Sequence, residues 1–451
     1  MLRTMYGQAK LLLGHGKEGS HLISISTEAH RTASSTATNF SVQPQPKQQQ
    51  PQQPQVPKAA VSRARLARHL ELTWRQGSAS HFPLTWLRDN CQCPQCYHPE
   101  SKSRTVDWAT CDVTIKPKDV QVSDDGKTVI VDWLDAHNSR FSAEWLHERR
   151  FEEDARKKWL STYKQKKHIW GSAQEENFPR KRFNFSAVMS TDGGLLQWLL
   201  ELEMRGVAIL EGADSDESTV RKLAERVAFI RRTHYGEEFN VKSKSDPSNV
   251  AYTEQALQLH TDLPYYEYKP GVNMLHCLMQ AQGEGGENQL VDSLRVAMQL
   301  KQNNPEAYKA LTTVPIDWSD RGVEDGRPFQ SLHRAPVICE DAEGNVVRVN
   351  YSQPQRDSHF SVPLEQVDGW YLALKEFTRL ALSDENCVQY KTKPGEILSF
   401  DNLRILHGRS SYSPAVNQIY ERHIVGAYLD WDEIRSRIRV LSQQEPTPLA
   451  H

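Results

Sequence analysis

The sequence of 451 residues has no long apolar run and almost no net charge, and each of these absences excludes a class of protein. A membrane-spanning helix needs about 18 or more apolar residues in succession, so we expect no membrane span. The 55 Lys and Arg residues nearly balance the 57 Asp and Glu residues, and no basic stripe interleaved with aromatic residues occurs. We therefore expect neither nucleic acid nor a membrane as a partner, and we expect a small-molecule protein.

The seven cysteines are too unevenly distributed for a disulfide framework. Three of them lie within the stretch CQCPQC at 91–96, which favours a reducing compartment and a metal site. The other four are scattered singly, and we expect them to be ordinary buried cysteines. They are Cys111, Cys277, Cys339 and Cys387.

Cys91, Cys93 and Cys96 have a C-x-C-x2-C spacing that lets three thiolates reach one ion from a single tight turn. Tetrahedral zinc then needs a fourth ligand. His98 is close in sequence, whereas His137 would come from the turn of a predicted strand pair and would link two distant segments. We prefer His137. The alternative is a loop of three reduced cysteines without a metal ion.

The N-terminal 60 residues are predicted to lie outside the folded domains. Residues 1–40 contain four Lys or Arg, two Glu and many Ser and Thr, and they resemble a mitochondrial transit peptide. The alternative is a disordered tail without an address, in a cytoplasmic protein. The Gln/Pro tract at 43–57 cannot bury apolar surface and is predicted to be a disordered spacer, so folding is expected to begin near Val61.

The rest of the chain is predicted to form two domains, at 61–165 and 180–445. The first consists of short strands and turns, including a strand at Thr128 to Trp133, a polar turn and a second strand that leads into a short helix. The second begins with two amphipathic helices at 193–206 and 217–232 and continues mainly as short strands. Many short strands separated by turns favour a mostly β sandwich or barrel of jelly-roll type with flanking helices.

His260 and Asp262 lie two residues apart at the end of a predicted strand, so both side chains are expected on one face. A mononuclear Fe(II) site in an oxygenase uses two histidines and one carboxylate, which leaves open positions on the metal. His407, at the end of another predicted strand, is the candidate for the second histidine. Ordinary hydrogen bonding is the alternative for an isolated His-x-Asp pair.

An oxygenase of this class must also hold a dicarboxylate co-substrate, and a buried arginine can grip a carboxylate with two parallel hydrogen bonds. Arg422 follows His407 by fifteen residues and is expected on the next strand. Taken alone it would be interpreted as a surface arginine. Together with the two histidines and the aspartate it is the expected anchor.

Four stretches together resemble the gamma-butyrobetaine and trimethyllysine dioxygenase family of Fe(II)/2-oxoglutarate oxygenases. They are NVAYTEQALQLHTDLPYYEYKPGVNMLHCLMQ, GGENQLVDS, FDNLRILHGRSSY and RHIVGAYLDWD. The resemblance extends from about Leu70 to Gln443 and is closer to the butyrobetaine enzymes. It implies a double-stranded β-helix for the larger domain, a small zinc-binding N-terminal domain, and a homodimer.

The resemblance also assigns roles to residues of both metal sites. His260, Asp262 and His407 would be the iron ligands, and Arg422 would bind the distal carboxylate of 2-oxoglutarate. Asn249 and Leu275 would assist Arg422. The zinc ligands would be Cys91, Cys93, Cys96 and His137.

The substrate of this family carries a trimethylammonium group, which cannot donate hydrogen bonds and must be held by the faces of aromatic rings. The matching positions are Tyr235, Phe239, Tyr252 and Tyr428. Phe239 departs from the family, where tryptophan stands, and Ser352 stands where we expect an asparagine that positions the substrate carboxylate. A bridging water would have to extend the reach of that serine.

Arg422 and Tyr428 have the same strand parity, but six extended residues span about 20 Å. Both can line one cavity only if the strand bends or ends between them, and Gly426 would permit a bend.

The implied reaction is the hydroxylation of gamma-butyrobetaine to L-carnitine, coupled to oxidative decarboxylation of 2-oxoglutarate, with O2 as oxidant and ascorbate as reductant. One alternative is the same chemistry on trimethyllysine or another quaternary amine. The other is a non-catalytic betaine-binding protein.

Overall fold

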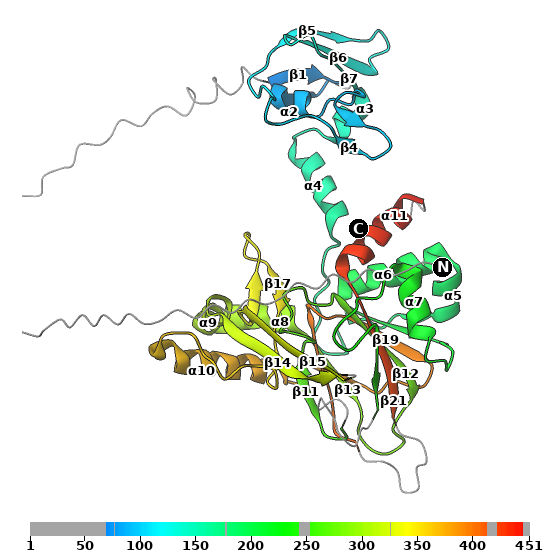
Figure 1. The fold of residues 1–451 in the computed structure, drawn as a ribbon, viewed down its shortest axis with the longest axis vertical. Coiled ribbons are helices and arrows are strands. Elements are labelled where there is room, and N and C mark those ends of the chain that lie inside the picture. Colours follow the sequence, from blue (N-terminus) through cyan, green and yellow to red (C-terminus); the bar gives the residue numbers. More distant parts are fainter. Residues whose placement is uncertain are drawn as a thin grey trace, which may run out of the picture. The chain divides into compact units, whose positions relative to one another are not determined.

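The structure is a computed structural model, and it describes residues 69–75, 77–175, 178–242, 253–324, 326–412 and 422–444 (Figure 1). The transit-like segment and the Gln/Pro tract lie outside these residues, and so do Asn249 and Tyr252. Within the described ranges, no helix combines the length and the apolar content that a membrane crossing requires.

The N-terminal part consists of short antiparallel strands with small helices between them. Its elements are β1 (His69–Thr73), β2 (Ala79–Pro83), α2 (Leu84–Asp89), β3 (Tyr97–His98), β4 (Ser103–Arg104), β5 (Pro117–Val122), β6 (Thr128–Trp133), β7 (Asn138–Ser142), α3 (Ala143–Glu148) and α4 (Glu153–Tyr163). Every second residue of β6 is buried, and β5, β6 and β7 form a three-stranded sheet. The predicted strand, turn, strand and short helix around Thr128 to Trp133 are therefore confirmed.

The larger part contains two main sheets. The six-stranded sheet has the order β10 (Glu238–Val241), β21 (His423–Leu429), β12 (Val272–Met279), β19 (Glu396–Asp401), β9 (Val207–Glu211) and β8 (Arg182–Asn184). The four-stranded sheet has the order β11 (Leu257–His260), β20 (Ile405–Arg409), β13 (Asn288–Asp292) and β18 (Cys387–Tyr390). Strands far apart in sequence are thus neighbours, and the expectation of a β-rich fold is confirmed.

Helices cover the outer faces of the two sheets. Those that share a core with the six-stranded sheet are α5 (Phe185–Ser190), α6 (Asp192–Arg205), α7 (Thr219–Val227) and α11 (Trp431–Gln444). Those that share a core with the four-stranded sheet are α8 (Ser293–Asn303), α9 (Pro305–Thr313) and α10 (Leu364–Ala381). The predicted helix at 217–232 is shorter in the structure, where α7 ends at Val227.

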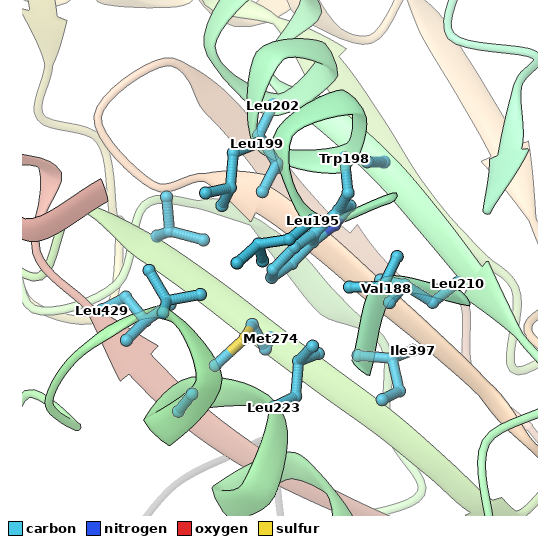
Figure 2. Close-up of a cluster of buried hydrophobic side chains, with 14 of the residues drawn as sticks. Val188, Leu195, Trp198, Leu199, Leu202, Leu210, Leu223, Met274, Ile397 and Leu429 are labelled. Atoms are coloured by element: carbon cyan, nitrogen blue, oxygen red, sulfur yellow. The ribbon is translucent and has the colours of Figure 1, made fainter. Parts of the chain in front are cut away.

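Helix α6 shows why these segments are helical. The Thr191 side chain caps its N-terminus by accepting a hydrogen bond from the amide of Gly194, and Gly206 ends it in the left-handed conformation with φ of 78°. Its apolar residues recur at intervals of three and four and pack on strand residues such as Met274 and Leu429 (Figure 2). This packing fixes the outer face of the sheet and leaves its inner face for the site.

Two hairpins complete the larger part. They are formed by β14 (Ile316–Glu324) with β15 (Arg327–Ala335), and by β16 (Ile338–Glu340) with β17 (Val346–Val349). Between the two main sheets lies a further apolar core that contains Leu398 and Phe400 from one sheet and Leu290 and Ile405 from the other.

Candidate metal centre and substrate cavity

A cavity of about 110 Å³ lies between the two main sheets of the larger part. The six-stranded sheet contributes lining residues from β10, β12 and β21, and the four-stranded sheet contributes residues from β11, β13 and β20. Nine of the predicted site residues in this part line the cavity: Tyr235, Phe239, His260, Asp262, Leu275, Ser352, His407, Arg422 and Tyr428. The two remaining predicted residues, Asn249 and Tyr252, lie outside the described residues.

The predicted iron ligands meet at one wall of this cavity. His260 and His407 are paired directly across β11 and β20, and their ring centroids are 4.2 Å apart. Asp262 Oδ1 lies 3.2 Å from His260 Nε2 and 3.5 Å from His407 Nε2. One carboxylate oxygen therefore faces both imidazoles, and the three ligand atoms lie within 4.8 Å of one another.

The strand prediction for the His260 and Asp262 pair is wrong in one respect. Strand β11 ends at His260, so Asp262 lies on the following turn. Asn402 holds this turn: its Oδ1 accepts from the Asp262 amide at 2.7 Å, and its Nδ2 donates to the Asp262 carbonyl at 3.0 Å. A side-chain clamp, and not strand parity, thus places the carboxylate. His407 also differs from its prediction, because it lies in the middle of β20.

Hydrogen bonds orient the ligands before any metal binds. Asp262 Oδ2 accepts from Asn273 Nδ2 at 2.6 Å and from Tyr428 Oη at 3.0 Å, which leaves Oδ1 for the imidazoles. His260 Nδ1 donates to the Gln258 carbonyl at 2.9 Å, so Nε2 presents its lone pair to the cluster. Burial opposes ionisation of Asp262, but the neighbouring imidazoles outweigh it and hold the pKa of this carboxyl below its usual range.

Two neighbouring arginines form a cationic part of the cavity wall. Arg422 is 7% exposed, and burial, followed by the charge of Arg409, lowers its pKa to about 10. Its Nε has no hydrogen-bond partner within the described residues. Two adjacent buried cations favour an anion at this position. Arg409 was not predicted, although its position two residues after His407 on a strand was the available signal.

Another part of the wall is aromatic. The rings of Phe239 and Tyr428 have centroids 4.9 Å apart, and those of Tyr235 and Phe239 are 6.3 Å apart. Gly426 is paired with Phe239 across the strands, and a Cβ atom on Gly426 would lie 2.1 Å from the phenylalanine ring. The glycine therefore makes room for the ring.

The sequence predicted that the strand bends or ends between Arg422 and Tyr428, and the second alternative holds, because β21 spans His423 to Leu429 and does not include Arg422. Arg422 lies one residue before the strand, and Tyr428 lies near its end. Both line the cavity, so the cavity extends along the strand.

Ser352 is buried in the cavity wall, and its Oγ donates a hydrogen bond to Gln355 Oε1. Gln355 lines the cavity as well. The serine hydroxyl is thus already hydrogen-bonded to Gln355. The amide nitrogen of Gln355 is a polar group on a longer side chain at the same position. No pattern in the sequence marked Gln355.

A second cluster lies in the N-terminal part. His137 Nε2 lies 3.2 Å from Cys91 Sγ, 3.6 Å from Cys93 Sγ and 3.5 Å from Cys96 Sγ. The four ligand atoms lie within 4.8 Å of one another. The alternative ligand, His98, is exposed, and its Nδ1 accepts a hydrogen bond from the amide of Ser101.

Neighbours of this cluster orient its ligands. Arg88 Nη1 donates to Cys96 Sγ at 3.4 Å, and the same guanidinium pairs with Asp135 at 3.2 Å. Asp135 Oδ1 in turn accepts from the His137 amide at 3.0 Å, which fixes the turn that carries the imidazole. Donation to sulfur favours the thiolate, the form that binds metal.

The remaining cysteines depart in part from their prediction. Cys277 is buried, but Cys111, Cys339 and Cys387 are only partly buried. Cys111 lies between exposed residues, whereas Cys387 lies between the buried residues Asn386 and Val388.

Comparison with known proteins places the chain in a family. The model of the family "Taurine catabolism dioxygenase TauD, TfdA family" matches residues 168–428, and the model "Gamma-butyrobetaine hydroxylase-like, N-terminal" matches residues 61–147. Gamma-butyrobetaine dioxygenase of Homo sapiens is 38% identical over 83% of this chain and 95% of its own length.

Two further relatives are more distant. Gamma-butyrobetaine dioxygenase of Pseudomonas sp. (strain AK-1) is 32% identical over 85% of this chain and 96% of its own length. The mitochondrial trimethyllysine dioxygenase of Mus musculus is 31% identical over 83% of this chain and 85% of its own length. The matched regions cover 85% to 96% of each relative. The chain is a 2-oxoglutarate-dependent dioxygenase and belongs to the TauD, TfdA family, in its gamma-butyrobetaine dioxygenase group.

Proposed function

We propose that the protein hydroxylates gamma-butyrobetaine to L-carnitine, with consumption of O2 and 2-oxoglutarate and release of succinate and carbon dioxide. The observation that carries this proposal is the triad of His260, Asp262 and His407 at the wall of a cavity that also has buried arginines and aromatic rings. The relatives named gamma-butyrobetaine dioxygenase support the choice of substrate.

The donor set at the triad fits Fe(II). Two imidazole nitrogens and one carboxylate oxygen face each other, and the tautomer of His260 is fixed by the Gln258 carbonyl. When bound, iron would supply the activation of O2 that this reaction requires. His260, Asp262 and His407 would hold it.

The remaining cavity residues bind and orient the two organic substrates. Arg422 forms a bidentate pair with the distal carboxylate of 2-oxoglutarate, and Arg409 adds a second positive charge beside it. Leu275 is the proposed apolar neighbour of the co-substrate. The buried position of both arginines excludes water and strengthens the ion pair.

The rings of Tyr235, Phe239 and Tyr428 offer their faces to the trimethylammonium group, and Tyr252 is proposed to complete this part of the site. Asn249 is proposed to assist Arg422 in binding 2-oxoglutarate. Tyr428 also donates its hydroxyl to Asp262, so one side chain links the cation site to the metal centre. This link fixes the distance between the bound cation and the triad. A single C–H bond of the substrate is thereby directed toward the oxidant.

Structural zinc is proposed to bind at the cluster of Cys91, Cys93, Cys96 and His137, since four ligands leave no position for substrate.

We also propose the domain division at 61–165 and 180–445 and closure of the two main sheets as a double-stranded β-helix. A homodimer and ascorbate as the reductant are proposed as well. The transit-like segment at 1–40 is the basis for a proposed mitochondrial location, with the cytoplasm as the alternative.

Trimethyllysine is the second candidate substrate, because Phe239 and Ser352 depart from the butyrobetaine pattern and the trimethyllysine dioxygenases are also relatives.

Succinate formation by Fe(II)-loaded protein separates these possibilities. The assay contains 2-oxoglutarate and ascorbate, with gamma-butyrobetaine, trimethyllysine or no amine, and the products are identified by mass spectrometry. Carnitine formed in equal amount to succinate is the expected result. Hydroxytrimethyllysine alone would select the second candidate, and no amine-dependent succinate would contradict the proposal.

A further inference from the structure

A tight turn brings Gln355 to the wall of the substrate cavity. The amide of Arg356 donates to the Gln353 carbonyl at 3.4 Å, so Pro354 and Gln355 occupy the two central positions of this turn. Ser352, Pro354 and Gln355 all line the cavity. The proline ring restricts the backbone at the first central position, which makes the turn stiff.

Both sides of the turn are fixed to the rest of the larger part. Before the turn, the Tyr351 carbonyl accepts from the Thr261 amide at 2.7 Å, and the Tyr351 amide donates to Thr261 Oγ1 at 3.2 Å. Thr261 lies between the histidine and the aspartate that begin the triad. Within the turn, the Gln355 carbonyl accepts from the Ser319 amide of β14 at 2.8 Å. Hydrogen bonds to the backbone therefore set the position of Gln355 relative to the triad.

The cation of this turn is directed toward helix α10. The Arg356 guanidinium lies 5.6 Å from the ring centroid of Trp370 and 5.1 Å from that of Tyr371, and its Nη1 donates to Tyr371 Oη at 2.9 Å. Its Nε donates to Gln353 Oε1 at 3.3 Å. These contacts hold the turn against the helix, and they leave the amide of Gln355 as the polar group that the turn offers to the cavity.

The side chain of Gln355 presents hydrogen-bond donors. Its Oε1 accepts from Ser352 Oγ, and its Nε2 donates to no other residue in the described part of the chain. An amide nitrogen carries two N–H donors, and a hydrogen bond from such a donor to a carboxylate is stronger than one to a neutral acceptor. An ammonium group would find only an oxygen that is already engaged. The chemistry of this position therefore suits a carboxylate.

We propose that Gln355 is a specificity-determining residue that binds the substrate carboxylate through Nε2, with Ser352 fixing the orientation of the amide. This inference rests on the proposed function, because it names the residue that recognises the acid end of gamma-butyrobetaine. The longer glutamine takes the place of the bridging water that the short serine would need. It also favours gamma-butyrobetaine over trimethyllysine, which carries an ammonium group beside its carboxylate.

The test compares the substrate with a cation that lacks the acid end. We measure KM for gamma-butyrobetaine and the inhibition constant of butyltrimethylammonium, in which a methyl group replaces the carboxylate. For Gln355→Leu we expect KM to rise about tenfold, from the loss of a hydrogen bond to a charged acceptor. The inhibition constant of butyltrimethylammonium is expected to stay within twofold of wild type.

The control is Gln366→Leu, which removes an exposed glutamine from α10 and should change neither constant. An unchanged KM in Gln355→Leu would overturn the proposal. A parallel rise of KM and of the inhibition constant in Gln355→Leu would also overturn it, because that result indicates a structural role.

A second variant reverses the preference. Gln355→Glu places a carboxylate opposite the substrate carboxylate, so KM for gamma-butyrobetaine should rise further than in Gln355→Leu. The dication 3-aminopropyltrimethylammonium, in which an ammonium group replaces the carboxylate, should inhibit Gln355→Glu more strongly than wild type. A structural role for Gln355 does not predict this gain, and inhibition no stronger than that of wild type would overturn the proposal.

Binding measured by calorimetry in the absence of O2 separates this proposal from the proposed function. If wild-type protein does not convert gamma-butyrobetaine, the proposed function fails, but the Gln355 inference is still tested. Tighter binding of gamma-butyrobetaine than of butyltrimethylammonium by wild type and Gln366→Leu, with loss of this preference in Gln355→Leu, supports it. Equal binding of the two ligands by wild type, or an unchanged preference in Gln355→Leu, overturns it.

Discussion

The two side-chain clusters of this protein differ in their number of ligands, in their chemistry and in their surroundings. The N-terminal cluster has four ligands, three of them sulfur atoms, and two of its cysteines are buried. The cluster in the larger part has three ligands, all nitrogen or oxygen, and it borders a cavity. A closed soft site suits a structural ion, whereas an open hard site leaves positions for reactants. Ligand count and an adjacent cavity thus separate a structural role from a catalytic one.

Loss of a ligand from the closed N-terminal cluster should destabilise the fold around it. Cys91→Ser removes one of the four ligands, and metal binding by such clusters contributes about 10 kcal/mol or more to folding in peptides. We expect β5, β6 and β7 to lose protection from hydrogen exchange and the protein to lose the zinc that this cluster is proposed to bind. Cys111→Ser is the control, since Cys111 lies outside the cluster in the same part. Retained protection in Cys91→Ser would show that the cluster does not hold this sheet together.

Loss of a ligand from the open cluster in the larger part should reduce turnover and leave stability nearly unchanged. Asp262→Ala removes a proposed iron ligand. Loss of a residue that only supports a ligand costs 10-fold to 100-fold, so we expect turnover to fall by more than about 100-fold. The melting temperature should stay close to that of wild type. Succinate formation and Fe(II) binding check the first expectation, and calorimetry checks the second. Asp384→Ala, at an exposed position, is the control. Full turnover by Asp262→Ala would contradict a catalytic role for this cluster, and with it the distinction between the two clusters.

The cavity beside the open cluster can be tested through its arginine. Arg422→Ala leaves the proposed carboxylate of 2-oxoglutarate without a partner, which at a buried charge pair costs about 2 kcal/mol or more. We expect KM for 2-oxoglutarate to rise about 30-fold, with a smaller rise for Arg422→Lys because one hydrogen bond of the fork remains. Arg379→Ala, on the exposed side of α10, should change nothing. A normal KM in Arg422→Ala would place the co-substrate elsewhere.

His276 lies outside both clusters, and its ionisation is expected to make the stability of the fold depend on pH. His276 is fully buried, neither ring nitrogen has a partner within the described residues, and burial lowers its pKa to about 4. The unfolded chain, with a pKa of about 6.5, binds more protons between these values. Its contribution to stability is therefore complete above pH 6.5 and is lost as pH falls toward 4.

We expect this histidine to cost about 1 kcal/mol of stability at pH 5.5. Urea unfolding at pH 7.5 and 5.5 measures the loss, and His276→Leu should reduce the difference between the two pH values. An equal difference in the variant would assign the pH dependence to other groups.

Much of the fold could be predicted because its elements carry local signals. The alternation of β6 and the three- and four-residue spacing of α6 depend only on which face is buried, so both were predicted with nearly correct bounds. The end of α7 at Val227 was not predicted, because the apolar spacing continues past the point where the tertiary structure ends the helix.

The residues of the two candidate sites also divide into those with a local sequence signal and those without one. The cysteine spacing and the His260 and Asp262 pair are local, and they led to both clusters. Asn402 could not be found from sequence, because it acts through a contact made only when distant segments meet: Asn402 lies 140 residues from Asp262. Contacts of that kind depend on the register between strands, which no local pattern specifies.

The pairing of His260 with His407 joins residues 147 positions apart (407 − 260), whereas Cys91 and His137 are 46 positions apart. During synthesis on the ribosome, the sulfur cluster can close while most of the chain has not yet been made. The second imidazole of the triad emerges only near the end of translation. The two proposed metal ions are therefore expected to enter in a fixed temporal order. A nascent chain that stalls before β20 would carry the first cluster without the second.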